Sequence, residues 1–143
     1  MPLLVLWLHV LAAMTWIGGM LFIALVLVPV VRRLDDRALR TRLVQATGRR
    51  FRSVGWIALT ILIATGLANL WLHPFLLHSP RLQWKLALVA LTLVLSAIHD
   101  FHLGPRAGLP TAGPWARARA SWLARLNVLV ALVIVLLGLS LFR

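Results

Sequence analysis

PLLVLWLHVLAAMTWIGGMLFIALVLVPVV, residues 2–31, contains no charged side chain. A helix needs about 20 apolar residues to cross the hydrocarbon core of a bilayer, with a range of roughly 17–25. A cleaved signal peptide has a basic start and a shorter apolar core of roughly 7–15 residues, so we retain this segment as a helix. Three further apolar stretches follow it in the chain. The sequence therefore predicts an all-α fold with four transmembrane helices, at about 3–31, 53–73, 82–103 and 122–142.

The composition agrees with a single transmembrane domain over residues 1–143. Hydrophobic residues make up 62% of the chain and the mean hydropathy is +0.94, whereas soluble domains are roughly 45–50% apolar. The absence of cysteine excludes disulfides and thiolate chemistry. There is no glutamate, no glycine-rich phosphate loop and no serine nucleophile motif. The sequence therefore contains no motif that assigns an enzymatic reaction. It also shows no convincing internal repeat.

The basic residues predict the orientation of the helices. Of the 15 lysines and arginines, 12 lie in or beside the predicted loops 32–52 and 104–121. Short cytoplasmic loops are rich in lysine and arginine, so we expect an antiparallel bundle with both termini on the non-cytoplasmic side of the bacterial inner membrane. Topology and attraction to anionic membrane lipid then explain the net charge of +12. Nucleic acid is not an expected partner. The sequence leaves open whether the protein forms a homo-oligomer.

His9 is the first of the few polar residues within the predicted spans. It shares a helical face with Ala12, Trp16 and Gly19, at spacings of three and four, and it lies roughly 9 Å inside the outer end. Because small residues allow close helix approach, this face is expected to contact another helix. Both a structural hydrogen bond and a ligand-binding or proton-handling role are open for this imidazole.

A seam of polar residues follows the third predicted helix. Lys85, Thr92, Ser96 and His99 lie within about 60° of one another around the helix, and Lys85 is at about the depth of His9. In the alternative interpretation, Lys85 snorkels to the headgroups and His99 lies at the inner interface. Two neighbours complete the polar set: Asp100, which follows His99, and Asn127, which is expected to bond another helix.

Imidazoles at matching depth on neighbouring helices could bind copper or hold a haem iron axially. The residues that we predict as metal ligands are His9, His73 and His99. His9 and His73 belong to the expected site near the outer face, and His99 lies at the inner end of its helix. The choice between copper and haem b is open on ligand chemistry alone, since both metals use neutral imidazole nitrogen.

The sequence resembles the copper-resistance D (CopD-like) membrane proteins along nearly its whole length. The resemblance is carried by LHVLAAMTWIGGMLF, FRSVGWIALTILIATGLANLW, WKLALVALTLVLSAIHDFHLGPRAG and WLARLNVLVALVIVLLGLSLFR. Its most specific pieces are Trp16-Ile17-Gly18-Gly19, Thr65-Gly66, Lys85 and His99-Asp100-Phe101. The resemblance implies copper handling or homeostasis, with a histidine-based metal site.

The chain is also similar to the HemJ-type protoporphyrinogen oxidases, small membrane proteins that bind haem b. His9, Trp16, Gly19, Lys85 and His99 occupy positions that match the pattern of that family. This similarity implies a cofactor-binding role for His9, Trp16 and Lys85 in a haem-dependent oxidoreductase. A third interpretation is an accessory membrane subunit with no chemistry of its own, whose polar residues only hold helices together.

Overall fold

The computed structural model describes residues 2–109 and 111–140, without the side chains of residues 76 and 140, and this part of the chain contains helices and no strand. Four of its helical stretches are long and apolar enough to cross a membrane: Leu3–Arg32, Arg37–Leu72, Pro80–Ala107 and Pro114–Leu139. The all-α class and the presence of four helices of spanning length are therefore confirmed for the described residues, while the last two residues of the predicted helix 122–142 lie outside them. The chain divides into two compact units, Met1–Pro74 and Phe75–Arg143. The four-helix bundle and the side on which the termini lie stay predictions.

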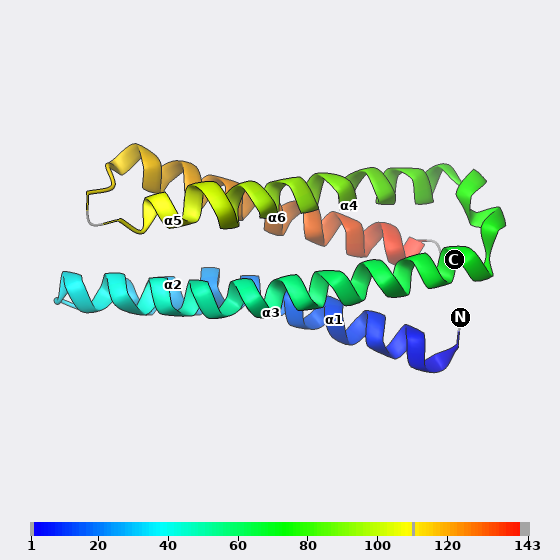
Figure 1. Cartoon of the computed structure of the whole chain (residues 1–143), viewed down its shortest axis with the longest axis horizontal. Helices are drawn as coiled ribbons and strands as arrows, with labels where there is room; N and C mark the ends of the chain where they lie inside the picture. The colour runs from blue at the N-terminus through cyan, green and yellow to red at the C-terminus, as the bar shows by residue number, and fades with distance from the viewer. Residues whose placement is uncertain (1, 110, 141–143) are drawn as a thin grey trace. The chain divides into compact units, whose positions relative to one another are not determined.

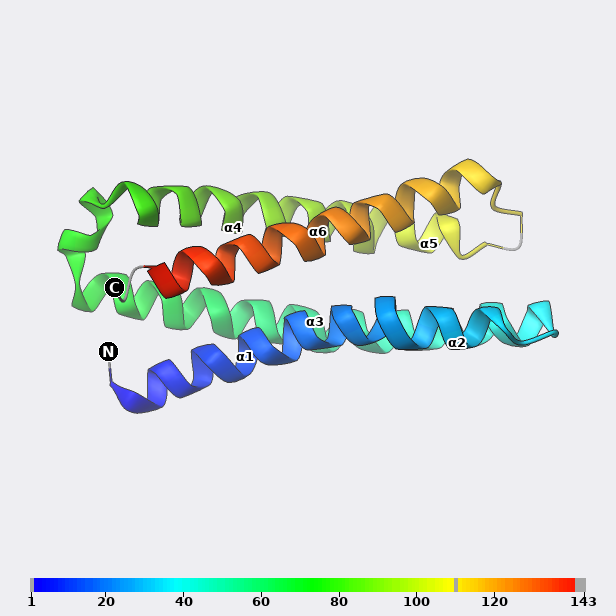
Figure 2. The same cartoon turned by 180° about the vertical axis from the view of Figure 1, so that it is seen from behind.

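Unit 1 is a helical hairpin. Its first arm consists of α1 (Leu3–Phe22), the π-helical segment η1 (Ile23–Leu27) and α2 (Val28–Arg32), and its second arm is α3 (Arg37–Leu72). Figures 1 and 2 show α1 lying along α3. Trp16 is only 6% exposed, and its Cδ1 atom lies 3.5 Å from the point that a Cβ on Gly55 would occupy. A glycine on one arm thus makes room for an indole on the other.

A tight turn joins the two arms of unit 1. Asp36 caps α3, because its carboxylate accepts hydrogen bonds from the backbone N–H groups of Ala38 (2.7 Å) and Leu39 (3.1 Å). Arg40 donates to the carbonyl oxygen of Leu34 at 2.8 Å across the turn. Residues 37–52 belong to the predicted basic segment 32–52, in which the pattern of apolar residues also suggests helix, and they are helical in the structure. They extend the apolar part of α3 by about 24 Å.

Unit 2 is a second helical hairpin. The 3₁₀ segment η2 (Pro74–His78) leads into α4 (Pro80–Ile98), which continues through the π-helical segment η3 (His99–Leu103) into α5 (Gly104–Ala107). The return arm is α6 (Pro114–Ser140), which lies beside α4 (Figure 2). The buried apolar residues of this unit come from both arms: Leu82, Leu95, Ala120, Val130 and Ala131.

The two units share a local feature that the sequence does not reveal. In each, the first arm passes through a five-residue π-helical segment, opening at Ile23 and at His99, which are 76 residues apart. A proline follows each segment, and Pro29 and Pro105 are also 76 residues apart. Proline cannot donate a hydrogen bond to the carbonyl four residues earlier and its ring clashes with it, and in both units that carbonyl belongs to the π segment. The wider turn is therefore the place where each arm accommodates its proline.

Gly19 offers a direct test of the helix contact in unit 1. A Cβ at this position would overlap the ring of Phe51, whereas a Cβ on Gly18 would meet nothing within 4 Å. We expect Gly19→Ala to destabilise the protein by about 1–3 kcal/mol, the usual cost of overpacking, in thermal unfolding followed by circular dichroism in detergent. Gly18→Ala, the matched control, gains the same helix propensity without the overlap and should not destabilise the protein. Equal effects of the two substitutions would show that α1 does not pack on α3 in this register.

Candidate functional site

His9 on α1 makes a hydrogen bond to the second arm of unit 1. Its Nδ1 atom lies 2.7 Å from the hydroxyl oxygen of Thr65 on α3. Thr65 is 8% exposed and His9 is half-buried. The imidazole is therefore held between two helices rather than directed into lipid, and its ring orientation is fixed by a side chain of the facing helix.

The partners of Thr65 decide which nitrogen of His9 carries the proton. The Thr65 hydroxyl lies 2.7 Å from the carbonyl oxygen of Ile61 and 3.2 Å from that of Leu62. A hydroxyl has one proton, and a carbonyl oxygen can only accept. Since Thr65 donates within its own helix, its oxygen accepts from the Nδ1–H group of His9. In the neutral ring, Nε2 then carries the lone pair, which is the form that binds a metal ion or takes up a proton.

His73 lies on the same face of α3 as Thr65. Asn69 and His73 follow Thr65 at intervals of four residues, so all three share one face of the helix. The Nδ1 atom of His73 lies 3.2 Å from the backbone carbonyl oxygen of Asn69, which again makes Nδ1 the donor and gives Nε2 the lone pair. His73 is about 12 Å beyond Thr65 along the axis of α3. Unit 1 therefore carries two imidazoles in the same tautomeric form, separated by about two helical turns.

In unit 2, the polar seam of α4 faces α6 along part of its length. Lys85 packs on the return arm, since its Nζ atom lies 3.3 Å from the point that a Cβ on Gly138 would occupy. Further along, Asn127 on α6 donates a hydrogen bond from Nδ2 to Ser96 Oγ at 2.9 Å, and both residues are buried. Two polar side chains of α4 thus meet α6 at points 11 residues apart in sequence, about 16 Å along the helix.

Thr92 lies between these two contacts. Its side chain is only 2% exposed, and its hydroxyl has no hydrogen-bond partner among the residues that the structure describes. Buried hydroxyl groups nearly always have a partner, so this group retains hydrogen-bonding capacity inside unit 2. Ser96 lies one turn further along the same face of α4.

His99 and Asp100 form a pair at the far end of the seam. The Nδ1 atom of His99 lies 2.9 Å from Asp100 Oδ1, with the two side chains 32% and 23% exposed. Both residues belong to η3, about 21 Å along the helix from Lys85. The carboxylate next in sequence therefore orients this imidazole within its own helix.

The structure gives each of the three predicted metal ligands a different partner. His9 contacts Thr65, His73 contacts the backbone of Asn69, and His99 contacts Asp100. Over residues 2–109 and 111–140, no group of three or more histidine, aspartate or glutamate side chains is placed to hold a metal ion. The residue that the site analysis of the sequence missed is Thr65, although Thr65-Gly66 was among the pieces that carried the family resemblance.

These features define a small multi-pass inner-membrane protein whose polar side chains are paired within helical hairpins. Residues 45–141 match the family described as copper resistance protein D, and the chain belongs to this family. The matched stretch covers most of α3 and nearly all of unit 2; α1 with His9 lies before it.

Comparison with curated proteins finds a similar protein of Aquifex aeolicus (strain VF5), which is described as uncharacterized. The two are 35% identical over 136 residues, which cover 94% of this chain and 91% of the relative. No solved structure matches the chain. The similarity to the relative thus extends over almost the whole chain.

The hydrogen bond between His9 and Thr65 predicts a difference between two threonine substitutions on α3. Thr65→Val removes the acceptor for His9, so we expect a loss of about 0.6 kcal/mol, and at most about 1.7 kcal/mol, in the free energy of unfolding. Thr60 is the matched control, because it is exposed and its hydroxyl donates to the carbonyl oxygen of Trp56 in the same backbone geometry. Equal losses in Thr65→Val and Thr60→Val, measured by unfolding in mixed micelles, would contradict the bond between the helices.

Proposed function

We propose that this protein handles copper in the membrane, with His9 as the residue that binds the ion near the outer face. Copper is the cargo in this proposal and not a resident cofactor. Membership of the copper resistance protein D family supports a role related to copper resistance. The observation that carries the proposal is the contact with Thr65, which gives the Nε2 atom of neutral His9 the lone pair.

The distribution of charge supports placing His9 near the non-cytoplasmic side. The basic residues of unit 1 lie between Arg32 and Arg52, at the end where the two arms are joined, and His9 lies near the opposite end. In short loops, lysine and arginine accumulate on the cytoplasmic side. We therefore infer that the start of α1 and the end of α3 face the outer side, so that an ion from outside reaches this end first.

The two imidazoles of unit 1 suggest an order of binding. His73 is the C-cap residue that follows α3 at the inferred outer surface, and His9 contacts α3 about 12 Å deeper, at Thr65. Imidazole nitrogen is a suitable ligand for copper, and each ring is held by a different residue of α3, His9 by Thr65 and His73 by Asn69. We infer that His73 captures the ion and that His9 receives it inside the membrane, while Thr65 positions the His9 ring.

Copper binding to the purified protein tests this function. We expect the protein in detergent, under reducing conditions, to bind copper(I) and to lose about one equivalent in His9→Ala, as measured by elemental analysis after gel filtration. Met14→Leu is the matched control: methionine is also a copper ligand, but Met14 lies on α1 with 68% of its surface exposed. This control should bind as much copper as the parent protein.

Other outcomes would contradict the role of His9 in copper binding or favour one of the alternatives. A Soret band that is present in the parent protein and lost in His9→Ala would favour a haem b-binding oxidoreductase, since the same nitrogen can hold haem iron. Undiminished copper binding in His9→Ala would contradict the assignment of His9 as the copper ligand. No binding of either metal by the parent protein would favour an accessory subunit in which the bond between His9 and Thr65 only joins two helices.

A further inference from the structure

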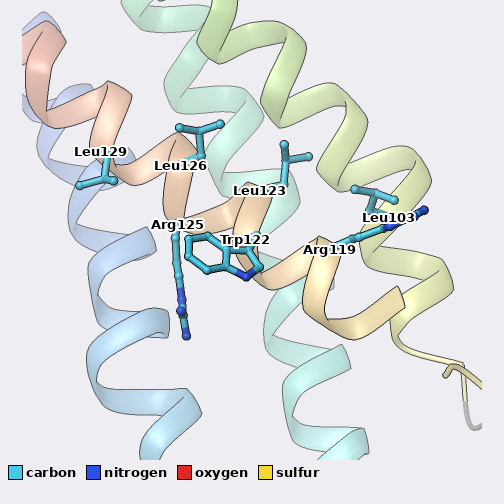
Figure 3. A pocket seen from close by; sticks show the side chains of 7 residues that line it. All are labelled: Leu103, Arg119, Trp122, Leu123, Arg125, Leu126 and Leu129. Atoms are coloured by element: carbon cyan, nitrogen blue, oxygen red, sulfur yellow. The ribbon is translucent and has the colours of Figure 1, made fainter. Parts of the chain in front are cut away.

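A hollow of about 460 Å³ lies in unit 2, where η3 ends and the first half of α6 begins its return. Leucines form its apolar part: Leu103, Leu123, Leu126 and Leu129. Three larger side chains complete the lining: Arg119, Trp122 and Arg125 (Figure 3). The surface of the hollow itself is almost wholly apolar, and the two arginines place their permanent positive charges at its edge.

The two arginines lie on either side of Trp122. In Figure 3, Arg119 extends toward Leu103, while Arg125 points away on the other side of the indole. The guanidinium carbon of Arg125 lies 5.6 Å from the centroid of the Trp122 ring, within the range of a cation–π contact. Asp100 is the only acidic residue between positions 75 and 143, and it is paired with His99. The charge of the two arginines is therefore available to an external anion.

The position of the hollow along α6 matches the boundary between headgroups and hydrocarbon. Arg125 is the last charged residue before the uncharged stretch 126–142. Tryptophan is enriched at this level of a membrane, and Trp122 is 69% exposed. Leu126 and Leu129 lie about one and two turns beyond Trp122 along α6, at the depth of acyl chains. An occupant must therefore be anionic at one end and apolar at the other.

We propose that this hollow is a docking site for one anionic phospholipid. Both arginines are exposed, so their long side chains can turn from either side of Trp122 toward one phosphate group, to which each can donate two parallel hydrogen bonds. The first part of an acyl chain lies against Leu126 and Leu129. A peptide or a soluble anion could satisfy the arginines but would not reach the leucines, which face hydrocarbon. This inference does not depend on copper handling.

Competition between two lipids tests the proposal. The protein in detergent is mixed with equal amounts of phosphatidylglycerol and phosphatidylcholine, and bound lipid is counted by native mass spectrometry. Each arginine near an anionic surface strengthens binding about five-fold. We therefore expect the parent protein to prefer phosphatidylglycerol and the double variant Arg119→Gln/Arg125→Gln to lose about 25-fold of this preference.

A control with the same change of charge separates the docking site from general attraction. Arg106→Gln/Arg117→Gln removes two exposed arginines at the same end of unit 2 that do not line the hollow, and it should keep the preference. Arg119→Lys/Arg125→Lys keeps the charge but not the paired donors of the guanidinium groups, so its preference should lie between those of the parent protein and the Arg119→Gln/Arg125→Gln variant. Equal binding of the two lipids by the parent protein would overturn the proposal, as would equal losses in the two glutamine variants.

Discussion

The hydrogen bond between His9 Nδ1 and Thr65 Oγ1 links the stability of unit 1 to its proposed chemistry. Acyl chains offer no hydrogen-bond partners, so a polar side chain within a span must find one on a protein helix. His9 finds Thr65, and Asn127 of unit 2 finds Ser96. Because Thr65 already donates to its own helix, the bond that joins the two arms also sets the tautomer of the imidazole. The structural and the ligand-binding interpretations of His9 are therefore compatible: one nitrogen holds the helix contact and the other carries the lone pair.

The shared π segments give the two hairpins a common register. His9 lies 14 residues before the start of η1, and Lys85 lies 14 residues before the start of η3. The same comparison relates Trp16 to Thr92, and both residues are buried. Each hairpin therefore offers one ionisable group and one buried group at corresponding positions, but the chemistry differs. An imidazole and an indole occupy these positions in unit 1, whereas an ammonium and a hydroxyl occupy them in unit 2.

Hydropathy and charge were sufficient to predict the spans, because a bilayer selects for long uncharged runs irrespective of their detailed packing. Contacts between helices were not predictable, since they depend on the register of one arm against the other. The sequence does not show why Trp16 is buried; the structure shows that Gly55 on the facing arm leaves room for its ring. The pairing of His9 with Thr65 and the position of Lys85 against Gly138 depend on register in the same way. The π-helical segments could not be predicted from the sequence. A proline indicates a kink or a break at its own position, whereas the wider helical turn comes before each proline.

Measuring which nitrogen of the His9 ring carries the proton tests the proposed role of His9 most directly. In protein labelled with ¹⁵N-histidine and reconstituted in lipid, the signals lost in His9→Gln identify this ring. We predict that Nδ1 carries the proton and Nε2 does not, and that copper(I), which is diamagnetic, shifts the Nε2 signal while Nδ1 stays protonated. A ring protonated at Nε2, or an Nε2 signal unchanged at saturating copper(I), would contradict the assignment of His9 as the copper ligand.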